Sequence, residues 1–410
     1  MKNNIKKNFI WNMIGSSINA IPSLLFLIIV TRINGKNDAG IFTFAFSMAC
    51  LFQVIGFYSG RTFQVTNHCK KISDCDFFYN RITTNILMVL FVIIFLLFKH
   101  YDFTKSFLLL LFVIYRLIDA ISDSFYAVIQ KDDRLYQVGI SLTVKGILSV
   151  FLFFIVDYIF SNMIYSTLSI VIINFIILIF YDIRKSKSVF KIRKYNNENN
   201  LNLLSLGFSV FAFTFLTQLI LNIPKYVIDN HLSSSYLTIY GIIVMPATFI
   251  VLCSQFVVQP FLIKIKRYIE QREMIRLRDL TFKIAAAVLF VGAICVIGAY
   301  IAGIPLLKLV YGINLDKYLV SLIIIIIGAT CFALSYVFST VLVALEKNVI
   351  QLIFYFIASI FMYIISNFLI IDYGVLGASI SYSFTMFILV IAYFLYFVLL
   401  LKKITKEYNI

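Results

Sequence analysis

Four ionisable residues lie inside two of the most apolar stretches of the chain. Arg116, Asp119 and Asp123 follow one another at positions i, i+3 and i+7 of one stretch, and Lys145 lies in the middle of the next. On a helix the first three occupy one face about 60° wide. Charge inside a bilayer is costly and usually marks a path for a substrate, an ion or a proton.

The two bases and two acids could instead pair with one another. A buried ion pair is cheaper than its separated parts, so Arg116–Asp119 and Lys145–Asp123 could be structural pairs. We rank function first. Arg116 and Lys145 are candidates for binding an anion, and Asp119 and Asp123 are candidates for coupling transport to H⁺ or Na⁺. The sequence leaves the exact pairing of the four open.

Polar side chains form stripes along three other apolar stretches. Such a stripe packs against protein or lines a water-filled space, because polar groups avoid lipid. For each stripe alone, hydrogen bonding between helices is an equally good explanation. Since stripes occur in the helices that open each half of the chain, we favour a central hydrophilic cavity. The stripes are Asn8, Asn12, Ser16, Asn19 and Ser23; Thr214, Gln218, Asn222 and Lys225; and Thr248, Gln255 and Gln259.

Long apolar runs position all of these residues. A hydrocarbon core about 30 Å thick requires roughly 20 apolar residues per helical crossing. With 61% hydrophobic and 13% charged residues and a mean hydropathy of +0.96, a soluble globular protein is excluded. We predict an all-α polytopic membrane protein with about 12 transmembrane helices. The runs are 9–31, 39–60, 82–98, 106–130, 135–157, 162–181, 201–223, 236–260, 281–302, 318–341, 349–371 and 376–401.

One polar stretch, 182–200, separates six runs from the other six. Its Asn- and Lys-rich composition is that of a solvated linker. We therefore predict an N-terminal lobe with its linker at 1–195 and a C-terminal lobe at 196–410. Transporters are often built from two such halves, with the substrate site between them. The two six-helix lobes are expected to surround the central cavity.

The basic residues predict the orientation. If the N-terminus is cytoplasmic, 26 of the 35 Lys and Arg residues face the cytoplasm and 7 face outward. This asymmetry follows the positive-inside rule and places both termini and the linker in the cytoplasm. The net charge of +16 then suits anionic membrane lipids, and nucleic acid is not required as a partner. The cysteines and histidines show no standard metal-ligand spacing, so no metal site is expected.

Three segments resemble one known family. They are the stretch from Asn12 to Arg61, QKDDRLYQVGISLTVKGIL at 130–148, and YGVLGASISYSF at 373–384. Together they resemble bacterial polysaccharide-biosynthesis flippases of the multidrug/oligosaccharidyl-lipid/polysaccharide exporter superfamily. The resemblance extends over essentially the whole chain. One departure is Ile33-Asn34-Gly35, where the family usually has Leu-Gly after the first basic residue.

The resemblance implies alternating access across a bacterial cytoplasmic membrane. Its cargo would be an oligosaccharide repeat unit on polyprenyl pyrophosphate, destined for capsule or O-antigen, with a polymerase and other polysaccharide-assembly proteins as partners. A pyrophosphate calls for basic side chains and sugars for polar ones. Positive-inside placement or snorkelling explains Arg32 and Arg61 equally well. The cavity candidates are Arg32, Arg61, Arg116, Lys145 and Lys225, and Asn12, Asn19, Gln218, Asn222 and Gln255.

Two other functions compete with this one. A drug or small-molecule antiporter of the same superfamily would favour an acidic cavity, whereas the five basic candidates outnumber the two acids. A membrane polymerase or ligase is expected to carry a large external loop, but the long polar loops here are on the cytoplasmic side. The chain lacks the G-x-x-x-x-G-K-[ST] motif that would bind ATP. We therefore expect a flippase that is not an enzyme, without a cofactor beyond H⁺ or Na⁺.

Overall fold

The structure is a computed structural model that describes residues 2–66, 72–187, 190 and 195–407. Those residues form helices joined by short turns, and none of them lies in a strand. The prediction of an all-α polytopic membrane protein is confirmed. The chain divides into two compact parts, unit 1 (Met1–Gln218) and unit 2 (Leu219–Ile410). The division falls inside a helix and further along the chain than the predicted lobe boundary at 195.

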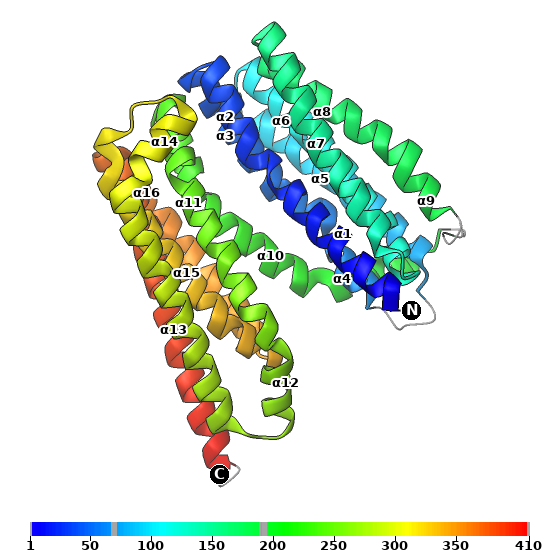
Figure 1. Cartoon of the computed structure of the whole chain (residues 1–410), viewed down its shortest axis with the longest axis vertical. Helices are drawn as coiled ribbons and strands as arrows, with labels where there is room; N and C mark the ends of the chain where they lie inside the picture. The colour runs from blue at the N-terminus through cyan, green and yellow to red at the C-terminus, as the bar shows by residue number, and fades with distance from the viewer. Residues whose placement is uncertain (1, 67–71, 188–189, 191–194, 408–410) are drawn as a thin grey trace. The chain divides into compact units, whose positions relative to one another are not determined.

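Unit 1 contains the helices of the first six predicted runs (Figure 1). The first run is interrupted at Pro22, which cannot donate a backbone hydrogen bond and therefore opens a new helix. Helix α6 packs against α3, α4, α5 and α8, so it is the central helix of the unit. The elements are α1 (Lys2–Ala20), α2 (Pro22–Ile33), α3 (Lys36–Phe57), α4 (Gly60–Val65), α5 (Asp74–Lys99), α6 (Phe103–Lys131), α7 (Leu135–Phe160), α8 (Met163–Ile177), the π-helix η1 (Leu178–Ile183), α9 (Arg184–Ser186) and the first part of α10 (Asn197–His231).

The sixth crossing continues past its predicted end. After α8 the chain forms the π-helix and then α9, which reaches Ser186. Asp182 is fully buried, although it was predicted to open the solvated linker. The prediction that the linker starts at 182 is therefore wrong, and α10 has already begun at Asn197. Residues 188–189 and 191–194 of the predicted linker lie outside the described residues.

Unit 2 contains the rest of α10 and the elements that follow (Figure 1). Helix α15 packs against α11, α13 and α16, and is the central helix of this unit. The elements are α11 (Ser234–Val258), the 3₁₀-helix η2 (Gln259–Phe261), α12 (Leu262–Glu270), α13 (Met274–Gly298), the π-helix η3 (Ala299–Gly303), α14 (Ile304–Tyr311), the 3₁₀-helix η4 (Asp316–Tyr318), α15 (Leu319–Ala344) and α16 (Asn348–Glu407).

The 60-residue segment α16 is a helical hairpin. Its backbone leaves the helical conformation at Gly374, where φ is 57° and ψ is −128°. The Ser366 hydroxyl donates to the Ser381 hydroxyl at 3.0 Å, although a continuous helix would hold them about 22 Å apart. The chain therefore reverses at Gly374, and the segment crosses the membrane twice.

Ten segments of the described chain are long and apolar enough to span a membrane when α16 is taken as one. The hairpin adds one crossing. Helix α6 adds another crossing. Its 29 residues are long enough to span the membrane, and it differs from the ten segments only in carrying more charged residues. The architecture thus agrees with the predicted twelve crossings and makes the chain a multi-pass membrane protein.

Candidate functional site

Helix α6 carries three of the charges that the sequence singled out, and Arg116 and Asp119 pair with each other. The Arg116 guanidinium lies 3.3 Å from the Asp119 carboxylate, so one of the two suggested structural pairs is present. Arg116 also donates to the sulfur of Cys50 on α3 at 3.2 Å. Its guanidinium lies 5.0 Å from the ring centroid of Phe46, a cation–π contact. Both charges are thereby held against α3.

Lys145 has a different partner from the one suggested. Its ammonium donates to Asp182 at 2.7 Å and to Ser122 at 2.6 Å, so the suggested Lys145–Asp123 pair is wrong. Lys145 is 2% exposed and Asp182 is fully buried. The hydroxyls of Ser141 (2.6 Å) and Tyr126 (3.3 Å) also donate to the Asp182 carboxylate. This network joins α6, α7 and the π-helix, and Lys145 reaches its partners entirely within unit 1.

Asp123 instead pairs with two arginines. Arg81 on α5 lies 3.4 Å from it and Arg61 on α4 lies 3.9 Å from it. Arg81 is 6% exposed, whereas the Arg61 side chain is 29% exposed. Two guanidinium groups against one carboxylate leave this group, which we call the Arg61–Asp123–Arg81 cluster, with a net positive charge.

The cluster also closes a break between two helices. Helix α3 ends at Phe57, and Tyr58 adopts a left-handed φ of 46° before α4 begins. The carbonyls at a helix end have no partner within the helix. Arg81 supplies donors to the carbonyls of Gly56 and Phe57. Arg81 donates to these carbonyls and also pairs with Asp123. It therefore fixes the position of the carboxylate that lies next to Arg61.

The clusters follow one another along α6. Asp119 lies near enough to Lys145 and Asp123 to interact electrostatically with both. The charged face therefore continues from the Arg116–Asp119 pair to the Arg61–Asp123–Arg81 cluster. Asp119 and Asp123, the coupling candidates, are each engaged with arginine in this conformation. No three His, Cys, Asp or Glu side chains gather as a metal site in the described part of the chain.

Sequence reasoning missed Arg81 and Asp182 because both were assigned to loops. The signal for Arg81 is the capping box of Ser73 and Asp76, which starts α5 early and places Arg81 two turns inside it. The signal for Asp182 is its spacing of eight residues from Asn174, which puts both on one helix face. Both residues are buried.

The polar stripe of α1 divides into a packed part and an exposed part. Asn8 donates to the carbonyl and the carboxylate of Asp133 at 2.9 and 3.0 Å, and accepts from the backbone of Tyr136 at 2.9 Å. The buried Asn12 Oδ1 has no hydrogen-bond partner among the described residues. Asn19 is exposed. Hydrogen bonding between helices therefore explains Asn8, and the cavity prediction concerns Asn12 and Asn19.

The remaining candidates lie on three helices. Arg32 is exposed in the last turn of α2. The Lys225 ammonium donates to the Asn222 side chain at 3.0 Å within α10. The seventh run was predicted to end at 223, but α10 continues to His231. Gln218 on α10 and Gln255 on α11 are half-buried. That these side chains line one shared cavity stays a prediction.

The twelve crossings and their connections define the fold of a known class of transporter. The chain superimposes on an inward-facing multidrug resistance transporter of the MATE family, in the MOP superfamily, with a TM-score of 0.74 at 10% identity, covering 96% of this chain and 99% of that one. The Vibrio cholerae MATE transporter VcmN in its bent form gives a TM-score of 0.62 at 15% identity, covering 98% of each chain. At such identities the likeness shows the fold alone.

One curated protein is similar in sequence. The capsular polysaccharide biosynthesis protein CapF of Staphylococcus aureus is 26% identical over 401 residues, covering 95% of this chain and 98% of the relative. No family model matches the sequence. The fold and the relative together confirm the predicted resemblance to polysaccharide exporters of this superfamily.

Proposed function

We propose that the chain flips polyprenyl-pyrophosphate-linked oligosaccharides across the cytoplasmic membrane for the synthesis of a surface polysaccharide. The proposal is supported by the similarity to a capsular polysaccharide biosynthesis protein along nearly the whole chain. It is supported independently by the charge of unit 1, where basic side chains are held inside membrane-spanning helices. The chain acts as a transporter and not as an enzyme in this proposal.

The Arg61–Asp123–Arg81 cluster is the observation that carries the proposal. Arg81 is buried and the Asp123 side chain is 14% exposed, whereas Arg61 keeps 29% of its side chain accessible. A guanidinium binds phosphate oxygens in bidentate geometry, and partial desolvation strengthens that bond. Arg61 is therefore the residue that we assign to the pyrophosphate, with Arg81 as the residue that positions it through Asp123.

A cation antiporter is the second candidate, because the solved structures with this fold include multidrug transporters. Such a protein needs acidic groups that can release one cation and bind another. Asp119, Asp123 and Asp182 are each already paired with a basic side chain. That pairing favours an anionic cargo over a cationic one.

Transport into liposomes tests the proposal directly. Purified protein is reconstituted with a fluorescent polyprenyl-pyrophosphate oligosaccharide, and a membrane-impermeant quencher reports how much cargo crosses. We expect the wild type to move the cargo and Arg61→Gln to slow it about ten-fold or more, since a charge-assisted hydrogen bond contributes about 1.5–3 kcal/mol. Movement of a cationic dye without movement of the lipid-linked sugar would establish the antiporter instead.

A matched variant separates this effect from a general loss of charge. Arg278 is an exposed arginine of unit 2 whose guanidinium lies 2.9 Å from Asp279. Arg278→Gln removes the same group from an exposed ion pair, so its transport is expected to equal that of the wild type. Equal transport by Arg61→Gln and Arg278→Gln would remove Arg61 from the site.

A further inference from the structure

The first part of α10 packs against the break between α3 and α4 (Figure 1). The Tyr58 hydroxyl in this break donates to the backbone carbonyl of Leu204 at 2.7 Å. The Tyr58 ring also stacks on Phe211, with the ring centroids 4.9 Å apart and the ring planes 14° from parallel. A Cβ added to Gly207 would lie 2.9 Å from the Tyr58 ring, so the ring lies directly against α10. Leu204, Gly207 and Phe211 share one face of the helix.

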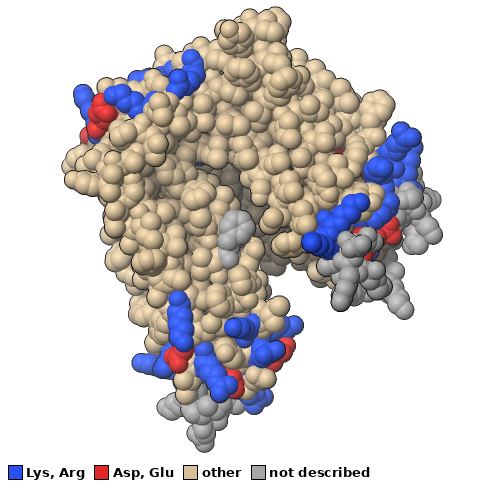
Figure 2. Space-filling model, viewed as in Figure 1, with Lys and Arg blue, Asp and Glu red and all other residues tan. Residues whose placement is uncertain are grey.

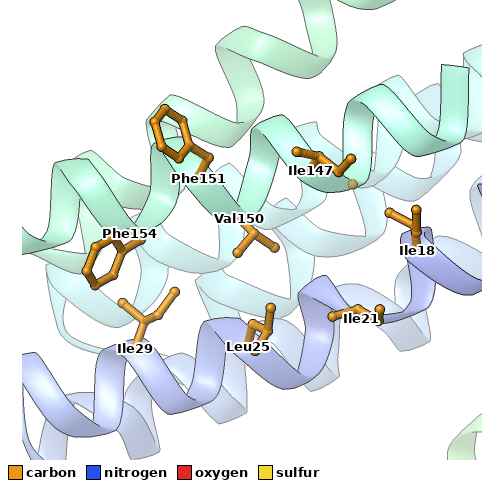
Figure 3. A pocket seen from close by; sticks show the side chains of 9 residues that line it. Ile18, Ile21, Leu25, Ile29, Ile147, Val150, Phe151 and Phe154 are labelled. Atoms are coloured by element: carbon orange, nitrogen blue, oxygen red, sulfur yellow. The ribbon is translucent and has the colours of Figure 1, made fainter.

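This contact fixes the position of α10 more tightly than apolar packing would. A groove beside α7, between that helix and the first two helices, is lined only by apolar side chains and a glycine, as Figure 3 shows. Apolar burial is non-directional and depends mainly on the area removed from water. A hydrogen bond between two oxygens instead requires them to lie within about 3.0 Å and in line. The bond from Tyr58 therefore holds Leu204 in one place against the break.

Tyr58 occupies a backbone conformation that residues other than glycine rarely adopt. Its φ is 46° and its ψ is −103°. Such a conformation costs free energy and persists only where surrounding contacts hold it, as they do in clamps and switch regions. Arg81 donates to the carbonyls of the two preceding residues, and α10 binds the Tyr58 side chain. The anion-site cluster and α10 therefore hold the same break from opposite sides.

The break also positions Arg61. Only Ser59 and Gly60 separate Tyr58 from Arg61, and Gly60 has a positive φ of 69°. Arg61 lies 3.9 Å from Asp123, which is the longest contact in the Arg61–Asp123–Arg81 cluster. An anion bound to Arg61 competes with Asp123 for the guanidinium. Arg61 is therefore the member of the cluster whose position depends most on whether an anion is bound.

Helix α10 leads from this break into unit 2. It begins at Asn197 in unit 1 and continues to His231, past the division between the units at Gln218. A helix is a rigid element that can pass a displacement along its length. Pro224 lies inside the helix and lacks a backbone N–H, so it provides a place for bending beyond the division.

We propose that Tyr58 couples binding of the cargo pyrophosphate at Arg61 to movement of α10, and through α10 to unit 2. The inference rests on the proposed function, because it takes the anion at Arg61 to be the cargo. When the cargo binds, the start of α4 moves with Arg61, and the Tyr58 hydroxyl draws the first part of α10 along. Tyr58 does not touch the cargo in this scheme and is a positioning residue.

The test separates cargo binding from cargo transport. Tyr58→Phe removes the hydroxyl and keeps the ring against Phe211. With the fluorescent polyprenyl-pyrophosphate oligosaccharide as the probe, we expect a Kd close to that of the wild type. We expect transport to slow about five-fold, the effect of losing one hydrogen bond. Tyr181→Phe is the matched control, because the Tyr181 hydroxyl donates to the Gln137 carbonyl at 3.3 Å and joins η1 to α7. It should bind and transport like the wild type.

Hydrogen–deuterium exchange follows α10 itself. Exchange of the peptide 197–211 is measured with and without the cargo. In the wild type we expect the cargo to change the exchange rate about two-fold or more, and in Tyr58→Phe we expect no change although the cargo binds. A purely structural role would alter exchange to the same extent with and without the cargo, and that result would overturn the proposal.

Gly207→Ala tests the contact from the side of α10, and keeps the test decisive if Tyr58→Phe does not fold. Its methyl group would lie against Ser59 and the Tyr58 ring. We expect normal cargo binding and slowed transport, as for Tyr58→Phe. Wild-type transport rates in both variants overturn the proposal. A loss of transport in Tyr181→Phe as large as that in Tyr58→Phe also overturns it.

The outcome is distinct from that of the assay on Arg61. Transport by the wild type, together with equal transport by Tyr58→Phe and Gly207→Ala, would overturn the coupling and leave the flippase standing. If the wild type moves no cargo, but the cargo still changes exchange in α10 and Tyr58→Phe abolishes that change, the coupling is supported and the proposed function is overturned.

Discussion

Unit 1 and unit 2 bury different kinds of polar group. Unit 1 keeps ionised side chains in its interior, most fully in the Lys145–Asp182 pair. In unit 2 the corresponding interior contact is neutral, with the Ser339 hydroxyl donating to Gln351 at 2.5 Å. Ion pairs of unit 2 such as Lys266–Glu270 lie at exposed positions.

Charged side chains are also unevenly distributed over the surface. In Figure 2 lysine and arginine side chains gather in groups, one of them around α12 of unit 2, and wide areas between the groups carry no charge. Charge at the ends of crossings serves orientation and contact with headgroups. Charge inside a crossing costs much more and calls for another explanation. The comparison therefore places the buried ion pairs in unit 1, where we propose that the anion binds.

The largest effect is expected for Lys145→Met. It leaves the buried Asp182 carboxylate without its cation, which costs about 3–5 kcal/mol of unfolding free energy. Lys145→Met combined with Asp182→Asn leaves no charge and is expected to recover most of that stability. Denaturant titration in detergent measures both variants. Lys266→Met, which breaks an exposed pair, is the control and should change stability little.

Transport by the same double variant tests what the pair is for. Lys145 was a candidate for binding the anion, but both groups are closed from solvent, so we now expect cargo movement to return together with stability. A stable double variant that moves no cargo would show that the Lys145 ammonium acts on the cargo and not only on helix packing.

The next effect concerns the contact between α1 and α7. Gly139→Ala places a methyl group against the backbone of Trp11, which cannot move as a flexible side chain can. We therefore expect the free energy of unfolding to fall by about 1–3 kcal/mol or more. A Cβ on Gly298 of unit 2 meets nothing within 4 Å. Gly298→Ala should therefore gain about 0.5–1 kcal/mol from the better helix former. Thermal inactivation in detergent compares the two, and equal behaviour would contradict the close approach of α1 and α7.

The sequence predicted the crossings well because bilayer thickness sets their length. Apolar runs located the segments, and i, i+3 spacing suggested the Arg116–Asp119 pair, since both depend on one helix alone. The partners of Lys145 and Asp123 could not be predicted from the sequence. Those partners, Asp182 and Arg81, come from other helices and were assigned to loops at the ends of runs.

The breaks within crossings at Pro22 and at Tyr58 have different causes. Pro22 divides the first crossing by its own chemistry, whereas the break at Tyr58 depends on Arg81, which binds the freed carbonyls from another helix. The groove beside α7 was also beyond prediction. It requires the close approach of two glycine-bearing helices, which a hydrophobic pattern does not encode.

The smallest effect is expected for the neutral contact in unit 2. Gln351 is 1% exposed, its oxygen accepts from Ser339 at 2.5 Å and from Tyr393 at 3.4 Å, and its amide nitrogen has no hydrogen-bond partner among the described residues. Ser339→Ala removes the shorter bond and should cost about 1 kcal/mol. Adding Gln351→Leu together with Tyr393→Phe removes the unpaired amide and also the hydroxyl that would lose its acceptor, so the combined variant should return to wild-type stability or exceed it. Denaturant titration measures both. If Ser339→Ala destabilised the protein as much as Lys145→Met, the two interiors would be equally dependent on their polar contacts. The contrast between an ionised interior in unit 1 and a neutral interior in unit 2 would then have no energetic meaning.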